Sequence, residues 1–294
     1  MPDWVSLAQN LINGLLIGSV YAMIGVGLTL IFGVMRVINF AHGDFVVVGM
    51  YTAILFSGLL GWDPYYSLII AVPFGFLLGV LIQHFVLRRI IDSPPETTML
   101  ATLGLALIVA NILLLTFGGE PQSVHVSYAS DTLRIGPVKV SFVLLLAGIA
   151  TVIVTGGLYL LLQKTEIGRA IRSTAENRLG AELVGVDTKK IQALVFGIGL
   201  TLALTAGVAL IPLLFATPTV TGPLFTLKAF VVTVLGGLGN VGAAIAGGLI
   251  LGVVEILGAS YISSEYRDAF GLVVFLIVLL FKPEGLFGRT VQRV

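Results

Sequence analysis

The chain has 294 residues, of which 57% are hydrophobic and only 11% are charged, with a net charge of +1 and no cysteine. This number of charged residues is too small to cover the surface of a soluble globule of this length, and the net charge provides no positive field that would attract nucleic acid. The lack of cysteine excludes disulfides and thiol chemistry. Apolar runs of about 18–25 residues recur along the chain, as membrane-spanning helices require. We therefore predict an all-α, polytopic membrane protein, with nearly all of residues 1–294 in a single transmembrane domain.

The apolar runs predict eight or nine membrane spans. The first six are expected at residues 11–32, 45–60, 66–87, 99–117, 140–162 and 191–215. The pattern then breaks, because a short run at 224–235 leads into the sequence Gly236-Gly237-Leu238-Gly239-Asn240, which is followed by runs at 241–257 and 269–281. The short run either crosses the membrane or belongs to a broken or re-entrant helix near 224–240.

Basic residues in short loops predict the orientation. They gather in three places, which we expect to be cytoplasmic together with the C-terminus: Arg88 and Arg89; the segment 164–190; and Lys282, Arg289 and Arg293. The connector 118–139 should then lie outside and form a small hairpin, and the N-terminus should lie outside if the short run crosses fully. No cleavable signal peptide is expected, because the N-terminus lacks basic residues and the first apolar run is too long.

The segment 164–190 is the one long charged stretch between spans. A helix is predicted over Glu166–Glu176, with Ile167, Ala170, Ile171 and Ala175 on one face and charged residues on the other. Asn177 and Gly180 should interrupt it, and a second short helix near Ala181–Val184 should end at Gly185. Such helices either lie among lipid headgroups or dock a soluble partner, and their mixed charge favours docking.

Asn39, His42 and Asp44 stand close together between the first two spans. They are too few to hold a metal ion, since the other two histidines, His84 and His125, lie in connectors predicted on different faces of the membrane. Two interpretations stay open. Asn39 or Asp44 caps the helix that follows, or the three residues lie on a solute path.

Lys228 and Glu255 are the ionisable residues inside the late spans, and we predict that they form an ion pair. A proton relay is the weaker alternative, since no further titratable groups are visible nearby. Gly236, Gly237 and Gly239 predict unwound backbone that lines a transport cavity, where Asn240 would offer hydrogen bonds. Three small-residue patterns predict close helix packing within one bundle: Gly14 with Gly18, Gly75 with Gly79, and Gly248 with Gly252.

The missing motifs narrow the function. The chain has no P-loop sequence (GxxxxGK followed by Ser or Thr) and therefore no such site for ATP, and neither HExxH nor GxSxG occurs. An ion-coupled secondary transporter would need acids on the path, and Glu255 is the only candidate. A membrane-embedded enzyme would have to use Asn39, His42 and Asp44. We predict no catalytic residues, no metal and no cofactor in this chain.

Four blocks of sequence resemble the bacterial branched-chain amino-acid ABC transporter permease family, and most closely its shorter, H-type subunit: Asn13–Asp44, Thr165–Asp187, Leu227–Glu255 and Glu265–Arg289. The resemblance covers nearly the whole chain. It implies a subunit of the bacterial inner membrane that takes part in importing leucine, isoleucine and valine. Related permeases carry urea, short amides or other amino acids, so these solutes remain alternatives.

The same resemblance implies the partners of the chain. These are a second, M-type permease, two cytoplasmic ATPases that hold ATP and Mg, and a periplasmic or tethered solute-binding protein. Gly168, Arg169, Ala175, Glu176 and Gly185 match the segment of the family that contacts the ATPase, and we expect Arg172 to face the ATPase with them. No motif assigns solute contacts, so Asn39, His42, Asp44, Gly236, Gly237, Gly239 and Asn240 are candidates for the solute path.

Overall fold

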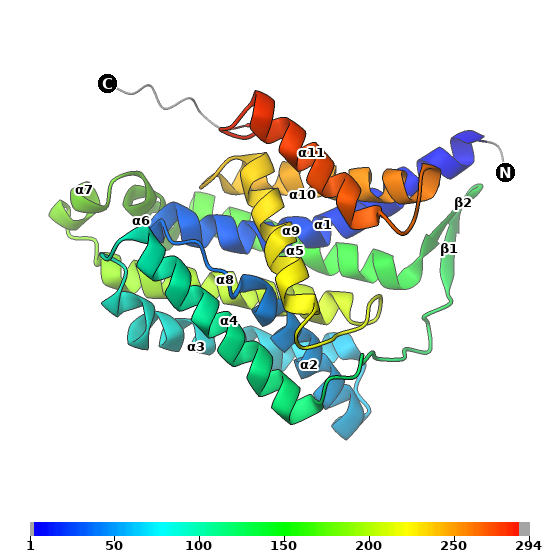
Figure 1. The fold of residues 1–294 in the computed structure, drawn as a ribbon, viewed down its shortest axis with the longest axis horizontal. Helices are drawn as coiled ribbons and strands as arrows, with labels where there is room; N and C mark the ends of the chain where they lie inside the picture. The colour runs from blue at the N-terminus through cyan, green and yellow to red at the C-terminus, as the bar shows by residue number, and fades with distance from the viewer. Residues whose placement is uncertain (1–2, 288–294) are drawn as a thin grey trace.

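The computed structural model describes residues 3–287, which form a bundle of α-helices with one small hairpin (Figure 1). Arg289 and Arg293, expected to be cytoplasmic, lie outside the described residues. The elements are α1 (Asp3–Met35), α2 (His42–Leu60), η1 (Pro64–Ser67), α3 (Leu68–Phe85), η2 (Leu87–Arg89), α4 (Pro95–Phe117), β1 (Thr132–Ile135), β2 (Val138–Ser141), α5 (Phe142–Lys164), α6 (Glu166–Glu176), α7 (Arg178–Leu183), α8 (Thr188–Leu210), α9 (Thr221–Gly236), α10 (Val241–Tyr261) and α11 (Arg267–Phe281).

Seven helical segments within residues 3–287 are long and apolar enough to cross a membrane. They are α1, α2, α3 with its flanking 3-10 turns, α4, α5, α8 and α10. The other two predicted spans are shorter, with 16 residues in α9 and 15 in α11. The prediction of an all-α, polytopic membrane protein is confirmed.

Helix α1 lies in the middle of the bundle, and small residues let its neighbours approach closely. A Cβ atom added at Gly252 of α10 would lie 2.3 Å from the Cα of Gly18 in α1. A Cβ at Gly79 of α3 would lie 2.7 Å from the Cα of Gly197 in α8. The predicted small-residue patterns therefore allow close packing of helices within one chain. In lipid, such van der Waals packing holds helices together, because the hydrophobic effect does not act between them.

The chain folds back on itself after α1. It turns at Arg36, which has a positive φ of 55°, and α2 begins at His42, whose Nε2 lies 3.0 Å from the carbonyl oxygen of Ile24 in the middle part of α1. Helix α2 therefore starts inside the bundle. No side chain caps α2 at its N-cap residue Ala41, so the predicted cap by Asn39 or Asp44 is wrong; Asn39 Oδ1 accepts from the Ala41 N–H at 3.2 Å, just before the helix, and the Gly43 N–H donates to Thr226 Oγ1 of α9 at 2.9 Å.

Helix α9 crosses the neighbouring helices steeply (Figure 1). It begins beside the first turn of α2, where a Cβ at Gly222 would meet the Asp44 carboxylate, and it ends at the turn 237–240. Gly237 and Gly239 have φ angles of 115° and 82°, so this turn requires glycine, and Asn240 then caps α10 by accepting from the Ala243 N–H at 3.1 Å. The predicted break between two helices lies at this turn.

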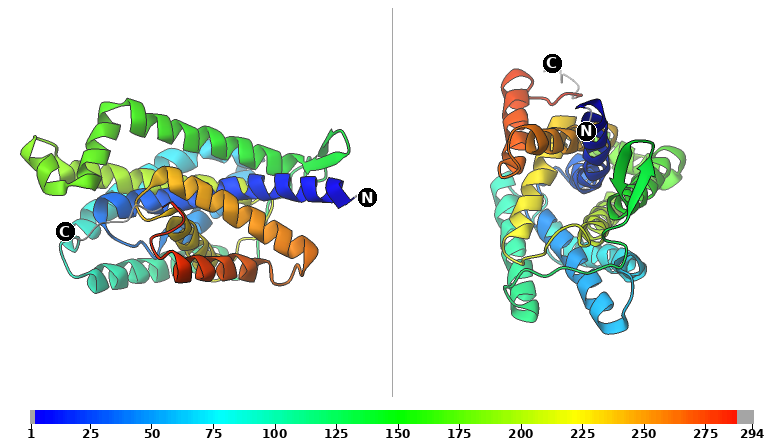
Figure 2. Two further views of the ribbon diagram at one scale, coloured as in Figure 1. Left: turned by 90° about the horizontal axis from the view of Figure 1, so that it is seen from above. Right: turned by 90° about the vertical axis from the view of Figure 1, so that its right-hand side faces the viewer.

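The two ends of the bundle are distinct. At one end, α6 and α7 project beyond the long helices, and at the other lie the hairpin and the start of α1 (Figures 1 and 2). The hairpin pairs β1 with β2 in antiparallel register, with Thr132 opposite Ser141, and Val138 and Val140 pack on Val5. This hairpin was expected within 118–139 and extends two residues farther. Near the α6–α7 end, the Leu286 N–H donates to Leu235 at the end of α9.

Candidate functional site

Five polar side chains meet between α1, α9, α10 and α11, three of them buried and the other two, Arg267 and Asp268, reaching the surface. We call them the charge cluster: Tyr21, Lys228, Glu255, Arg267 and Asp268. Lys228 Nζ contacts Glu255 Oε1 and lies 2.7 Å from Asp268 Oδ1. The other carboxylate oxygen of Glu255 accepts from the Tyr21 hydroxyl at 3.0 Å and lies 3.6 Å from Arg267 Nε. Glu255 is 1% exposed, so its charge depends on these partners.

The charge cluster goes beyond what the sequence predicted. Lys228 and Glu255 do meet, but the statement that no other titratable groups lie nearby is wrong. Arg267 and Asp268 open α11, and that helix returns antiparallel to α10, which brings both residues beside Glu255. Positive and negative charges balance within the cluster, because two cations face two carboxylates. The cluster therefore joins four helices without a net charge.

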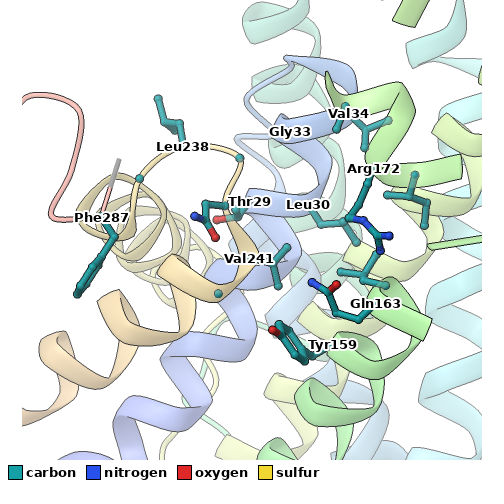
Figure 3. A pocket seen from close by; sticks show the side chains of 17 residues that line it. Thr29, Leu30, Gly33, Val34, Tyr159, Gln163, Arg172, Leu238, Val241 and Phe287 are labelled. Carbon is teal, nitrogen blue, oxygen red and sulfur yellow. The ribbon is translucent and has the colours of Figure 1, made fainter. Parts of the chain in front are cut away.

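A cavity of about 570 Å³, which we call the α6 cavity, lies at the α6–α7 end (Figure 3). It brings together two groups that are distant in the sequence: Arg172 and Ala175 of the charged segment, and Gly237, Gly239 and Asn240 of the glycine turn. Tyr159, Gln163 and Arg172 lie along one wall, opposite Leu238 and Phe287 (Figure 3). Gly236 lies outside this lining, because it packs on Ala243 and Ala244 of α10.

The segment 164–190 is held firmly by side-chain caps. Thr165 caps α6 through the Gly168 N–H, Asn177 caps α7 through the Gly180 N–H, and Asp187 caps α8 through the Lys190 N–H. The hydrogen bond from Lys190 also lowers the pKa of Asp187. Gly180, expected as a break, lies inside α7, and this helix starts earlier than predicted because Asn177 begins it. Gly185 follows the end of α7, as predicted, with a φ of 88°.

The buried side of α6 differs from the predicted one. Gly168, Ile171 and Thr174 are buried, whereas Ile167, expected on the packed face, is 47% exposed. A Cβ at Gly168 would lie 2.3 Å from the carbonyl oxygens of Leu161 and Leu162, so this glycine allows α6 to turn back against the end of α5. Arg169 points away from the packed side and pairs with Glu166 at 3.2 Å.

Helix α7 exposes apolar side chains that the sequence analysis did not single out. Leu179 is 73% exposed, Leu183 88% and Val184 79%, and we call these three residues the α7 patch. The four-residue spacing of the two leucines places them on one helical face, which was the available signal. Arg178 of the same helix is bound to Asp92 at 2.8 Å, so the patch is presented by an anchored element.

Asn39, His42 and Asp44 do not share one site. Asn39 and His42 are fully buried, and neither is among the residues that line the cavities of the described chain. The His42 Nε2 faces a carbonyl oxygen, which favours the tautomer with the proton on Nε2. Asp44 is 3% exposed and lines a second cavity, of about 560 Å³, between α4 and α9, which we call the α4/α9 cavity. Within residues 3–287 no group of three or more His, Cys, Asp or Glu side chains could hold a metal ion.

Comparisons with known proteins agree with this architecture. Residues 10–279 match the family model for the permease component of branched-chain amino acid transport systems. The chain belongs to this family. It is 30% identical to the high-affinity branched-chain amino acid transport system permease protein BraD of Pseudomonas aeruginosa, over 98% of each chain. It is also 30% identical to the corresponding protein LivH of Escherichia coli K12, over 96% of this chain and 95% of LivH.

A solved structure shows the same fold at low sequence identity. PsaBC from Streptococcus pneumoniae, in complex with a Fab, matches 94% of this chain and 92% of its own with a TM-score of 0.51 and 14% identity. The family resemblance expected from the four sequence blocks is confirmed, and the chain is a multi-pass membrane protein of a transport system. The predicted contacts with an ATPase and with a solute remain predictions.

Proposed function

We propose that this chain is one of two membrane subunits of an ATP-driven importer of leucine, isoleucine and valine in a bacterial plasma membrane. The observation that carries the proposal is the segment 164–190, in which three side-chain caps and the buried Ile171 fix α6 and α7 to the bundle. This rigid element presents charges and the α7 patch to the outside of the bundle. The relatives named as branched-chain amino acid permeases support the choice of solute.

The α6–α7 end is the cytoplasmic end in this proposal, and an ATPase docks there. The basic residues that the structure describes, Arg88 and Arg89, those of the segment 164–190, and Lys282, gather toward this side, as the positive-inside rule requires. ATP and Mg are held by the partner ATPases, since this chain has no P-loop sequence. The α7 patch provides the apolar anchor of the interface, and the exposed Arg169 and Glu176 provide its charged rim.

The α6 cavity gives a physical route from the ATPase to the solute path. Arg172 and Ala175 of α6 line the same cavity as the glycine turn that joins α9 to α10. A movement of α6 that changes the shape of this cavity would therefore also shift the glycine turn and the end of α9. The first turns of α9 lie against the start of α2, where Thr226 Oγ1 accepts from the Gly43 N–H, so a shift of α9 would also move the buried start of α2. Coupling of this kind requires two arrangements of packed helices.

The other partners take the remaining surfaces. Helices α4, α9 and α11 lie on one side of the bundle (Figure 2), and α4 exposes large apolar side chains such as Leu107 and Leu115 there. This side is the one that we assign to the second, M-type permease. The hairpin end receives the solute-binding protein. Lipid covers the rest of the apolar surface, as expected for a multi-pass protein.

The docking assignment is tested by removing the α7 patch. Leu179→Ala and Leu183→Ala should each weaken ATPase binding about tenfold or more, because a leucine that becomes buried contributes roughly 1.5–3 kcal/mol. The measurement is the amount of ATPase that co-purifies with this chain. Leu77→Ala is the matched control, since Leu77 is 57% exposed on α3, a helix that the proposal assigns neither to the ATPase nor to the second permease. Undiminished ATPase recovery in the double variant would refute the assignment.

An ion-coupled secondary transporter is the rival class, and its acids would come from the charge cluster. Reconstitution separates the two. The purified chain in liposomes without any ATPase should not accumulate leucine under a proton or sodium gradient. Accumulation under those conditions would overturn the ATP-driven proposal. Uptake of urea, short amides or other amino acids in preference to leucine by the complete transporter would retain the mechanism and change the solute.

A further inference from the structure

The α4/α9 cavity is an apolar space with a few polar groups. It has a volume of about 560 Å³, within the range of small-molecule sites, and most of its lining is apolar, including Phe40, Met99 and Phe230. The polar residues of its lining are Asp44, Asn111, Thr219 and Thr226. Asp44 is the only ionisable one. A membrane-embedded carboxylate on a cavity wall marks a functional site unless a protein cation neutralises it.

No such cation is found near Asp44 within residues 3–287. No Lys, Arg or His nitrogen of the described chain forms a salt bridge with it, and its side chain donates to and accepts from no other described side chain. What stands next to it is the first turn of α9, since a Cβ at Gly222 would lie 2.1 Å from Asp44 Oδ1. The partial positive charge of a helix N-terminus stabilises a carboxylate there but leaves its acceptor sites open to a ligand.

The position of Asp44 is fixed by long-range contacts. Thr226 Oγ1 of α9 accepts from the Gly43 N–H at 2.9 Å and donates to the Phe40 carbonyl oxygen at 3.0 Å. Thr102 of α4 in turn contacts the Ile38 carbonyl oxygen and the Phe40 N–H. The starts of α2 and α9 are thus joined next to the cavity. Discontinuous helices that meet inside the membrane are the common frame of a transport site.

We infer that the α4/α9 cavity is the solute site of the permease and that Asp44 binds the α-ammonium group of the amino acid. This inference rests on the proposed function and names the group that the permease recognises. The apolar wall of α4 and α9 would take the aliphatic side chain of leucine, isoleucine or valine. The site is amphiphilic like its ligand: one charged group at the joined helix starts, and an apolar wall along α4.

Single-cysteine labelling tests this, because the chain has no cysteine of its own. Thr219→Cys places a thiol on the exposed part of the cavity wall, and Ser264→Cys places a control thiol on an exposed loop between α10 and α11. The complete transporter in membranes is treated with a water-soluble thiol reagent, and modification of this chain is followed by mass. Leucine should slow labelling at Thr219→Cys and leave Ser264→Cys unaffected.

Three probes separate the groups of the ligand. Leucine and leucinamide both keep the ammonium group and should protect Thr219→Cys, whereas 4-methylpentanoate keeps only the carboxylate and side chain and should not. In an Asp44→Asn background the leucine concentration for half protection should rise about tenfold or more, as expected when a charge-assisted hydrogen bond is lost. Asp131→Asn, on an exposed loop, is the control for replacing a carboxylate by an amide.

Several results would overturn the inference. Protection by 4-methylpentanoate equal to that by leucine would show that the ammonium is not recognised, and absence of protection by any of the three probes would show that leucine does not occupy the cavity. Loss of the second permease from purified Asp44→Asn transporter, with leucine protection retained, would assign Asp44 to a contact between subunits. If Asp44→Asn does not accumulate in membranes, the three probes on the Asp44 protein decide alone.

The outcomes also separate this inference from the proposed function. Normal leucine uptake by Asp44→Asn transporter would leave the importer in place and refute the site. Conversely, Asp44-dependent protection by another ammonium-bearing amino acid, without protection by leucine, would support the site and refute the proposed solute.

Discussion

Glu255 and Asp44 are both carboxylates inside the bundle, but their surroundings are opposite. Glu255 is surrounded by Lys228, Arg267 and the Tyr21 hydroxyl, so each of its oxygens has a protein partner. Asp44 lies between the first turns of α2 and α9, has no salt-bridge partner within residues 3–287, and faces a cavity of about 560 Å³. A fully paired carboxylate holds helices together, whereas an unpaired one on a cavity wall is available to a ligand. The predictions below test this difference through stability, from the largest expected loss to the smallest.

Lys228→Met should cause the largest loss of stability. The change leaves Glu255, which is 1% exposed, with Arg267 as its only nearby cation at 3.6 Å. Removing one partner of a buried ion pair costs about 3–5 kcal/mol, and we expect a loss in that range. Thermal unfolding of the purified protein measures it, with Lys139→Met, at an exposed position of strand β2, as the matched control.

The double variant sharpens this test. Lys228→Met combined with Glu255→Gln removes both charges, so its loss should be clearly smaller than the sum of the two single losses. Additive losses would show that the two side chains do not interact in the membrane-embedded protein, and the comparison with Asp44 would lose its basis.

Tyr21→Phe should cause an intermediate loss. The hydroxyl donates to Glu255 at 3.0 Å and lies 3.4 Å from Arg267, and the phenyl ring keeps the packing of α1. A hydrogen bond to a charged group contributes about 1.5–3 kcal/mol, so the unfolding free energy should fall by that amount. An unchanged unfolding temperature would indicate that Lys228 and Arg267 suffice for Glu255.

The sequence predicts the paired region better than the unpaired one. Long apolar runs locate the spans, and two lone charges inside them, Lys228 and Glu255, suggest each other as partners because burying either alone is costly. Arg267 and Asp268 could not be assigned, because their place beside Glu255 depends on how α11 packs against α10. The contacts that fix the position of Asp44 could not be predicted. Thr226 accepts from the Gly43 N–H across 183 residues of sequence, and such a contact leaves no local signal.

Helix α6 shows a similar limit of prediction from the sequence. The sequence predicts a charged, amphipathic segment at 164–190, and both helices are present. It cannot tell which face packs, however. Gly168 brings α6 so close to the end of α5 that Ile171 is buried while Ile167 is exposed. Close backbone approach of this kind depends on the three-dimensional path of the chain and not on the hydrophobic period.

Asp268→Asn should cause only a small loss. Its carboxylate lies 2.7 Å from Lys228, but the side chain is 52% exposed, so water screens the pair. Partly exposed ion pairs contribute about 0–1 kcal/mol. Lys228 also keeps Glu255 as its buried partner. The unfolding temperature of this variant should therefore lie close to that of the unchanged protein. A loss of stability as large as that of Lys228→Met would show that the cluster depends on Asp268, its exposed member.

Asp44→Asn should change stability least and transport most. The amide removes an uncompensated charge from an apolar environment, which favours the variant, and it gives up the attraction to the start of α9, which is about 0.3–1 kcal/mol for a helix terminus. The two effects oppose each other, so the unfolding temperature should stay near that of the unchanged protein or rise. Leucine uptake by the complete transporter should nonetheless fall strongly, because the lost carboxylate is the group that meets the solute. A loss of stability comparable to that of Lys228→Met would show instead that Asp44 is held by a structural partner, and the contrast with Glu255 would fail.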